Sequence, residues 1–450
     1  MITCFLGVII TSISVIVSYS SLAIAINLIV FFILIGVIIF PDIKSLLNVL
    51  GLSTGNIINS HTYFFKSLSE TKFKNRKLGS YLWKFRIFII PIAIIIIFLI
   101  LYRFSNPVFD NLFVKAARFI NQYLNFLFLH FDPNIILTFL LGMIISIFIF
   151  YRTADDHIIG HDKKALDILI RTRTNVKRKF RFNSLKNEVK AAVFLLIVLN
   201  IMILVLNIID INWVWFNFEW NGQYLKQFVH EGTYLLIFTI VISIVIVLYF
   251  FRGNLNFYSK NQFLKYLSYF WLVQNGILTI SVAIRNFWYI QYFSLAYKRI
   301  GVIIFLILTL YGLFSVLIKV KYKKSAFYLF KTNTYAILVI LIISSLFNWD
   351  TIIAKYNFRN YERSFVHLDF LSTLSDKALP YLDKSMQELS TINQFQKESF
   401  PFKFKYMTPE KYHEIIEERK KHFMLKWESK TFLSWNLPEY NTYRKLSGRN

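Results

Sequence analysis

The chain has 450 residues, of which 56% are hydrophobic, 18% aromatic and only 17% charged, a composition that excludes a soluble enzyme built around one core. Its 51 lysines and arginines against 25 acidic residues give a net charge of +26, which in a soluble protein would suggest a nucleic-acid partner. The single cysteine, Cys4, excludes an internal disulfide framework and a cysteine-based metal site.

Nine apolar segments without an interior acid or base approach the roughly 20 residues that a helix needs to cross a bilayer. They lie at 2–18, 22–40, 87–102, 135–151, 191–209, 234–251, 267–283, 301–318 and 334–349. Met1 enters the first segment without a preceding basic residue, so we expect a retained span and not a signal peptide. The sequence therefore predicts an all-α, polytopic transmembrane helix bundle.

Basic residues are unevenly distributed between the two sides of these predicted spans. The connections on one side hold 27 lysines and arginines and those on the other side hold 7, and basic residues are retained on the cytoplasmic side. This distribution predicts an N-terminus inside and, after nine crossings, a C-terminal segment outside. Membrane orientation thus accounts for most of the positive charge.

The predicted organisation has four parts. Residues 1–102 hold three spans and a basic cytoplasmic loop, 103–134 an outer amphipathic helix, 135–349 six further spans, and 350–450 a small, mainly helical outer tail. The amphipathic helix, predicted from apolar residues at helical spacing, would lie on the outer membrane surface or across the mouth of the bundle. In the tail, Thr408-Pro409-Glu410 predicts a helix start with a hydroxyl N-cap.

A run of bases close to the fifth span favours contact with anionic lipid head groups on the cytoplasmic side, at about 1 kcal/mol per base. The run comprises Arg171, Arg173, Lys177, Arg178, Lys179 and Arg181. No base-stacking or groove-reading module surrounds it, so we expect no nucleic-acid partner. Arg252 and Asn254 flank Gly253 at the end of the sixth span, where they would meet lipid phosphates or close the helix.

Three consecutive predicted spans bring polar residues to the outer face. These residues are His230, Glu231, Arg285, Asn286, Tyr289, Lys298 and Arg299. Ionisable groups at such depth are costly unless they are paired or hydrated, so the set forms a candidate outer polar pocket. Its arginines could hold a carboxylate or phosphate while His230 or Glu231 exchanges a proton. The alternative is an interfacial salt bridge between Glu231 and an arginine that locks the helices together.

Two further polar groups carry weaker signals. Gln274 and Asn275 lie near the middle of the seventh span, where amides usually hydrogen-bond a neighbouring helix. His157, His161 and Asp162 have the spacing of a helix-borne metal site, but the glutamate of a zincin motif is absent and Gly160 weakens the helix. We therefore expect no metal site and no cofactor.

Several motifs of the C-terminal half are fairly specific as a set. They are HEGTY at 230–234, FFRGNL at 250–255, Gln274-Asn275, RNxxY at 285–289, YKRIGV at 297–302 and IAKYN at 353–357. Through these motifs the chain resembles a bacterial polytopic inner-membrane family catalogued only as a domain of unknown function. The resemblance implies a bacterial cytoplasmic-membrane protein with an outward C-terminal segment, and it supplies no activity or substrate.

Three classes of function follow from these observations. The absence of charges inside the predicted spans favours a non-catalytic protein that uses the outer pocket and the tail to bind an envelope component or partner. An enzyme for a lipid-linked or phosphate-bearing substrate would use His230 or Glu231 as a base at the outer leaflet. A transporter would need discontinuous spans and two related halves, and neither is visible.

Overall fold

The computed structural model describes residues 1–70, 72–73, 76–77, 91, 94–95, 98–99, 107–127, 133–153, 156–171, 179–218, 222–400, 407–431 and 434–448. Apart from the two-residue strands β1 (Lys72–Phe73) and β2 (Arg76–Lys77), which pair antiparallel, the regular structure of these residues is helical. The all-helical class predicted from the sequence is therefore confirmed. The chain divides into two compact units, one made of Met1–Leu34, Lys44–Leu47 and Lys164–Asn450 and the other of Ile35–Ile43 and Asn48–Lys163.

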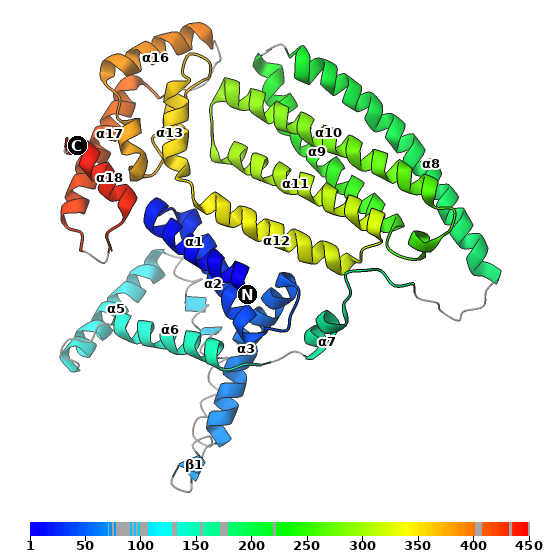
Figure 1. Cartoon of the computed structure of the whole chain (residues 1–450). Helices are drawn as coiled ribbons and strands as arrows, with labels where there is room; N and C mark the ends of the chain where they lie inside the picture. The colour runs from blue at the N-terminus through cyan, green and yellow to red at the C-terminus, as the bar shows by residue number, and fades with distance from the viewer. Residues whose placement is uncertain are drawn as a thin grey trace. The chain divides into compact units, whose positions relative to one another are not determined.

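The first unit contains a bundle of long helices with α10 at its centre. Its elements are α1 (Ile2–Ser18), most of α2 (Ser21–Ile39), α8 (Lys179–Asp210), the π-helix η1 (Ile211–Phe216), α9 (Gly222–Phe250), the 3-10 helix η2 (Asn254–Phe257), α10 (Gln262–Phe293), α11 (Tyr297–Tyr322) and α12 (Ala326–Ser345). Helix α10 packs against α8, α9 and α11, and α12 packs against α11 and α1. In Figure 1, α8, α10 and α12 run in one direction and α9 and α11 in the other.

Several helices have the length and composition of membrane spans. In the described part of the chain, five qualify, namely Ser21–Ile39, Leu185–Phe216, Gln262–Phe293, Tyr297–Tyr322 and Ala326–Ser345. Three shorter apolar helices, Ile2–Ser18, Ile135–Phe150 and Tyr234–Phe250, coincide with other predicted spans. The predicted span 87–102 lies largely outside the described residues. These helices identify a multi-pass membrane protein, whereas the number nine and the orientation remain predictions.

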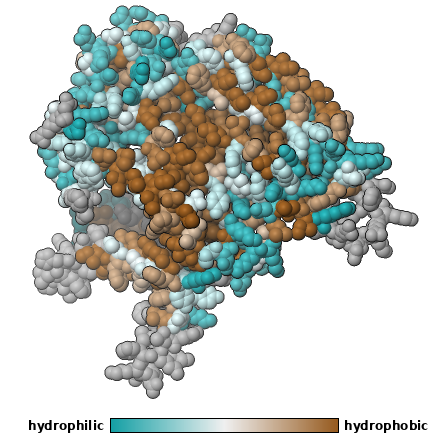
Figure 2. All heavy atoms as spheres, in the orientation of Figure 1, coloured by the Kyte–Doolittle hydropathy of each residue, from teal (hydrophilic) through white to brown (hydrophobic). Residues whose placement is uncertain are grey.

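The surface of the bundle agrees with a lipid environment. Figure 2 shows that hydrophobic residues cover α11 and α12, while the tail is mostly hydrophilic. Large apolar side chains are well exposed on these helices, for example Phe314 and Phe330 at 58% and 59%. An apolar surface of this size would be unfavourable in water, whereas lipid tails can cover it.

Helices α8 and α10 continue well past the C-terminal ends of the spans predicted for them. The segments 191–209 and 267–283 stop where the apolar run stops, but the observed helices continue to Phe216 and Phe293. The prediction ended each span at the first charged side chain. The helices continue because those charges are buried and paired with each other, so Asp210 and Arg285 lie within helices and not in loops.

In the second unit, helix α3 (Leu46–Glu70) occupies a stretch that the hydropathy pattern placed in a basic loop, and it is followed by α5 (Pro107–Leu127), α6 (Pro133–Phe150) and α7 (Asp156–Lys164). Asn56 ties α3 to the end of α6, because its amide donates to the Phe148 carbonyl at 3.0 Å and its oxygen accepts from the Thr153 amide at 2.7 Å. Helix α5 lies in the segment for which an amphipathic helix is predicted, and its place on the membrane surface remains a prediction.

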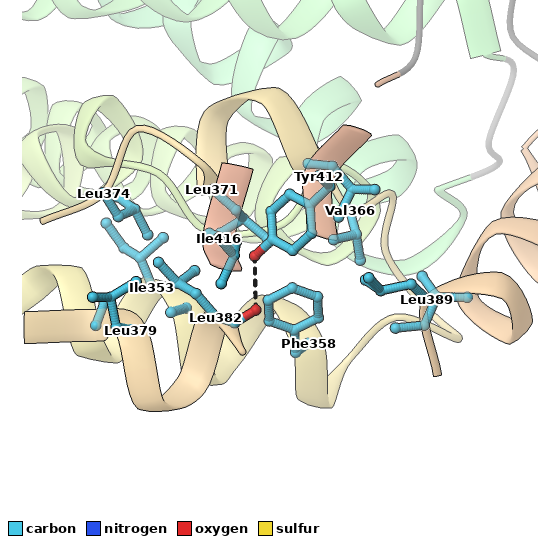
Figure 3. Packing of buried hydrophobic residues seen from close by; sticks show 14 of the residues in the cluster. Ile353, Phe358, Val366, Leu371, Leu374, Leu379, Leu382, Leu389, Tyr412 and Ile416 are labelled. Carbon is cyan, nitrogen blue, oxygen red and sulfur yellow. Dashed lines mark hydrogen bonds between the residues drawn. The ribbon is translucent and has the colours of Figure 1, made fainter. Parts of the chain in front are cut away.

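The tail is a helical subdomain with its own core. It comprises α13 (Trp349–Arg359), α14 (Leu368–Leu371), η3 (Asp376–Ala378), α15 (Leu379–Leu382), α16 (Met386–Ser399), α17 (Pro409–Glu428) and α18 (Leu437–Leu446). Thr408 caps α17 and Pro409 occupies its first turn, as the sequence predicts. Figure 3 shows the core, in which the Tyr412 hydroxyl group donates to the Leu382 carbonyl at 3.0 Å. Ile300 of α11 belongs to the same cluster, so the tail packs on the bundle.

Candidate functional site

A buried ion pair joins α8 to α10. The Nη2 atom of Arg285 lies 2.5 Å from Oδ1 of Asp210, and the two side chains are only 5% and 3% exposed. Asp210 is the last residue of α8, and the π-helix η1 starts directly after it. Irregular helix of this kind often accompanies functional sites, and an ion pair within a span is either functional or a lock between helices.

Amides continue this polar contact along the two helices. Gln274 Nε2 donates to Asn200 Oδ1 at 2.7 Å, and Asn207 Nδ2 donates to the Gln274 carbonyl at 3.1 Å. Nearer the ion pair, the indole nitrogen of Trp215 donates to Ser281 Oγ at 2.8 Å. From the Gln274–Asn200 bond to the Arg285–Asp210 pair, residue numbers increase in the same direction on α8 and α10, as expected for parallel helices. Polar groups therefore hold the two helices together along much of their length.

Arg299 closes the turn between α10 and α11. Its Nη1 atom donates to the carbonyls of Phe293, at 2.6 Å, and of Ser294. The guanidinium lies 4.5 Å from the centre of the Tyr289 ring, and Asn286 Nδ2 donates to the Arg299 carbonyl at 3.1 Å. A cation at the C-terminal end of a helix offsets the partial negative charge there. Asn286, Tyr289 and Arg299, all predicted members of the outer pocket, thus lie together.

The same turn holds the tail. Ser294, at φ 67°, bonds Ser364 Oγ at 2.8 Å and the Phe365 carbonyl at 2.9 Å. Asn357 of α13 accepts from the Leu295 amide at 2.7 Å and donates to the Leu295 carbonyl at 3.0 Å. These bonds satisfy backbone groups on both sides of the junction, so the tail is fixed to the ends of α10 and α11.

A pocket of about 110 Å³ opens in the tail beside this junction. One wall is the segment 365–369, the other is one face of α16, and Met407 completes it. Gln396, which is part of the lining, joins the two walls, because its oxygen accepts from the Val366 amide at 2.9 Å and its amide donates to the carbonyls of Tyr361 and Ser364. The lining combines apolar side chains with His367, Asp369, Asn393 and Lys397.

His367 in this pocket has an unusually low pKa. Burial, together with the smaller effect of the nearby positive charge of Arg299, lowers the pKa of the imidazole from 6.5 to about 4. The ring packs edge to face on Phe365 with centres 4.5 Å apart. His367 is therefore neutral at pH 7.

We expect the tail to lose stability as the pH falls from about 6.5 to about 4, because the unfolded chain takes up a proton there that folded His367 does not. The unfolding midpoint of the purified protein, measured between pH 7 and pH 4.5, should fall less for His367→Asn than for the unmodified chain. His413→Asn, elsewhere in the tail, is the control. Equal pH profiles for His367→Asn and the unmodified chain would contradict this expectation.

Of the other four predicted pocket residues, the structure describes the side chains of Arg285 and Lys298. Arg285 contacts Asp210 on the α8 side of α10, and Lys298 is exposed at the start of α11. His230 and Glu231 belong to α9, and their side chains lie outside the described part of the structure. Whether the predicted set acts as one pocket remains a prediction.

At the opposite end of the bundle, Arg252 stacks on the Tyr249 ring at 4.0 Å, and buried Lys319 donates to the Phe251 carbonyl at 2.8 Å. Lys319 was not singled out from the sequence, because its position in a basic stretch suggested an exposed loop. Arg171 is exposed, and the side chains of the other predicted lipid-contact residues lie outside the described part of the structure. These are Asn254, Arg173, Lys177, Arg178, Lys179 and Arg181.

The remaining candidates contact other groups of the protein. Asn275 donates to the Trp271 carbonyl at 2.8 Å within its own helix. The rings of His157 and His161 stack with centres 5.3 Å apart, and Asp162 accepts from Asn48 at 2.7 Å. Among the residues that the structure describes, no group of three or more histidine, cysteine or acidic side chains is placed to hold a metal ion.

Asp210 and Gln396, like Lys319, are structurally important polar residues that the sequence analysis does not identify. An acid directly after one apolar run, together with an arginine directly after another, is a usable signal for Asp210. No comparable signal marks Gln396, because its partners are backbone atoms of a distant turn.

Comparison with curated proteins gives no match, and comparison with solved structures gives none. A family does match, and its match extends well into the N-terminal half, beyond the motifs that carry the resemblance. Over residues 2–385 the chain matches the family described as Domain of unknown function (DUF4153), and it therefore belongs to that family.

Proposed function

We propose that this chain is a non-catalytic binding protein of the bacterial cytoplasmic membrane, with its tail outside, where it engages an envelope component or partner. The observation that carries the proposal is the open pocket between segment 365–369 and α16. Binding sites are concave and mostly apolar with a few polar groups, and this lining has that character. The tail is held firmly by the Ser294 and Asn357 contacts, which suits a recognition surface.

The arrangement of α1 supports an inside N-terminus together with an outside tail. Helix α1 packs against α12, and Gly7 allows a close approach, since a Cβ atom there would lie 2.9 Å from Ile342. At its other end, Lys377 of the tail donates to the Tyr19 carbonyl. One crossing of α1 therefore leads from the N-terminus to the level of the tail. Anionic lipids remain our proposed partners for the bases on the cytoplasmic side.

The alternatives receive less support. A phosphate-binding enzyme would need arginines available to its substrate, but both Arg285 and Arg299 already bond protein oxygens. A transporter is favoured by the intramembrane Asp210–Arg285 pair, yet α9, α10 and α11 are unbroken helices.

The binding proposal is tested by photo-crosslinking of the full chain in native membranes. A photoreactive phenylalanine analogue in place of Asn393, on the rim of the pocket, should form a specific adduct. The same analogue in place of Glu414, exposed on α17, is the matched control. Lys397→Glu should reduce the adduct at position 393 several-fold. Absence of an adduct at 393, or identical adducts at both positions, would argue against recognition by this pocket.

A further inference from the structure

The interface between α8 and α10 is unusually polar for the interior of a membrane bundle. Asn200, Asn207 and Asp210 occupy one face of α8, at spacings of seven and ten residues, and they meet Gln274 and Arg285 of α10. Each of the five side chains belongs to a residue no more than 4% exposed. They are therefore shielded from lipid by the helices themselves.

The direct hydrogen bonds across this interface do not use all of its acceptor oxygens. The side-chain amide of Asn207 donates to the Gln274 carbonyl, and that of Gln274 donates to Asn200 Oδ1. Arg285 donates to Oδ1 of Asp210. Within the described part of the chain, Asn207 Oδ1, Asp210 Oδ2 and Gln274 Oε1 have no hydrogen-bond partner. Three buried acceptors thus lie on the facing sides of two helices.

Buried acceptors in a membrane interior require a donor, because lipid tails supply none and an unpaired acceptor is costly. The aliphatic side chains of the bundle core, such as Leu196, Ile203 and Leu278, carry no donor, and the indole nitrogen of Trp271 donates to the Ser243 carbonyl instead. Water is small enough to enter a polar interface of this kind and can bond two to four partners.

We propose that the α8–α10 interface binds a file of water molecules that runs past Gln274 and Asn207 to the carboxylate of Asp210. Asn207 and Asp210 are three residues apart on one helix, about 4.5 Å along the axis, so a single water molecule can bridge their oxygens. The π-helix η1 begins at Ile211, where an inserted water relieves the change of helical register. The file gives the buried carboxylate access to solvent protons, which goes beyond the binding function of the tail.

Thiol accessibility tests this water file in the full-length protein. Cys4 is the only cysteine, so a Cys4→Ala background carries no other thiol. In that background, Ag⁺ should protect Asn207→Cys from later maleimide labelling at least ten-fold faster than Ile208→Cys, its lipid-facing neighbour, which is 58% exposed. Equal or slower protection at position 207 overturns the proposal.

A second measurement covers the case in which Asn207→Cys fails to fold. A density map of the unmodified protein at a resolution that shows ordered water should contain peaks within hydrogen-bond distance of Asn207 Oδ1, Gln274 Oε1 and Asp210 Oδ2. A map in which these three oxygens accept bonds from protein donors, with no water between α8 and α10, overturns the proposal.

Discussion

Arg285→Met should destabilise the protein by about 3–5 kcal/mol, because it leaves the carboxylate of Asp210 buried without its partner. The double variant Asp210→Leu with Arg285→Met should recover most of that loss, since removing both charges removes the cost of burying them. Both effects are measured by unfolding each variant in mixed micelles and monitoring the amount of folded protein by size-exclusion chromatography.

Lys298→Met is the control for this experiment, because it removes an exposed base near the same end of the bundle and should change stability by less than about 0.5 kcal/mol. A protein that uses Arg285 to hold a ligand predicts a different pattern, in which Arg285→Met stays folded and loses function. That result would show that Arg285 has a functional role and that the ion pair is not needed to hold α8 and α10 together.

The positions of the membrane helices follow from hydropathy alone, and their ends do not. Predicted and observed limits agree for α1, which ends at Ser18, because no charge interrupts or follows that run. They disagree for α8 and α10, where a rule that stops at a charge cannot see that Asp210 neutralises Arg285 from another helix. Tertiary pairing, which lies outside any local pattern, decides those ends.

Helix α3 was missed for a related reason. Its apolar residues are diluted by Ser53, Asn56 and Ser60, all of which are buried. A hydropathy average counts these side chains as polar surface. In the structure, Asn56 satisfies backbone groups at the end of α6, so a polar residue occupies a packing position.

The candidate site is predictable from the sequence only where the ends of consecutive helices lie at the same face of the membrane. Alternating direction brings the end of α10 and the start of α11 together, and Asn286, Tyr289 and Arg299 do meet there. The same argument cannot place the pocket in the tail, because segment 365–369 and α16 are neighbours only after the tail has folded around Gln396.

Leu379→Ala should destabilise the tail by about 2–5 kcal/mol, because Leu379 is fully buried in the tail core and the smaller side chain leaves a cavity. The tail folds around one hydrophobic cluster, so loss of packing at one residue should loosen α13 to α18 together. Hydrogen exchange measured by mass spectrometry on the full chain should show faster exchange throughout these helices, while α10 and α12 keep their protection.

Leu425→Ala is the matched control, since it makes the same change at a residue that is 69% exposed on α17, where the effect should stay within about 0.5 kcal/mol. Faster exchange confined to the few residues around Leu379 would show that the tail is not one cooperative unit. A rigid recognition surface needs that cooperativity, because the pocket walls come from segments more than twenty residues apart, and only the shared core keeps them at a fixed separation.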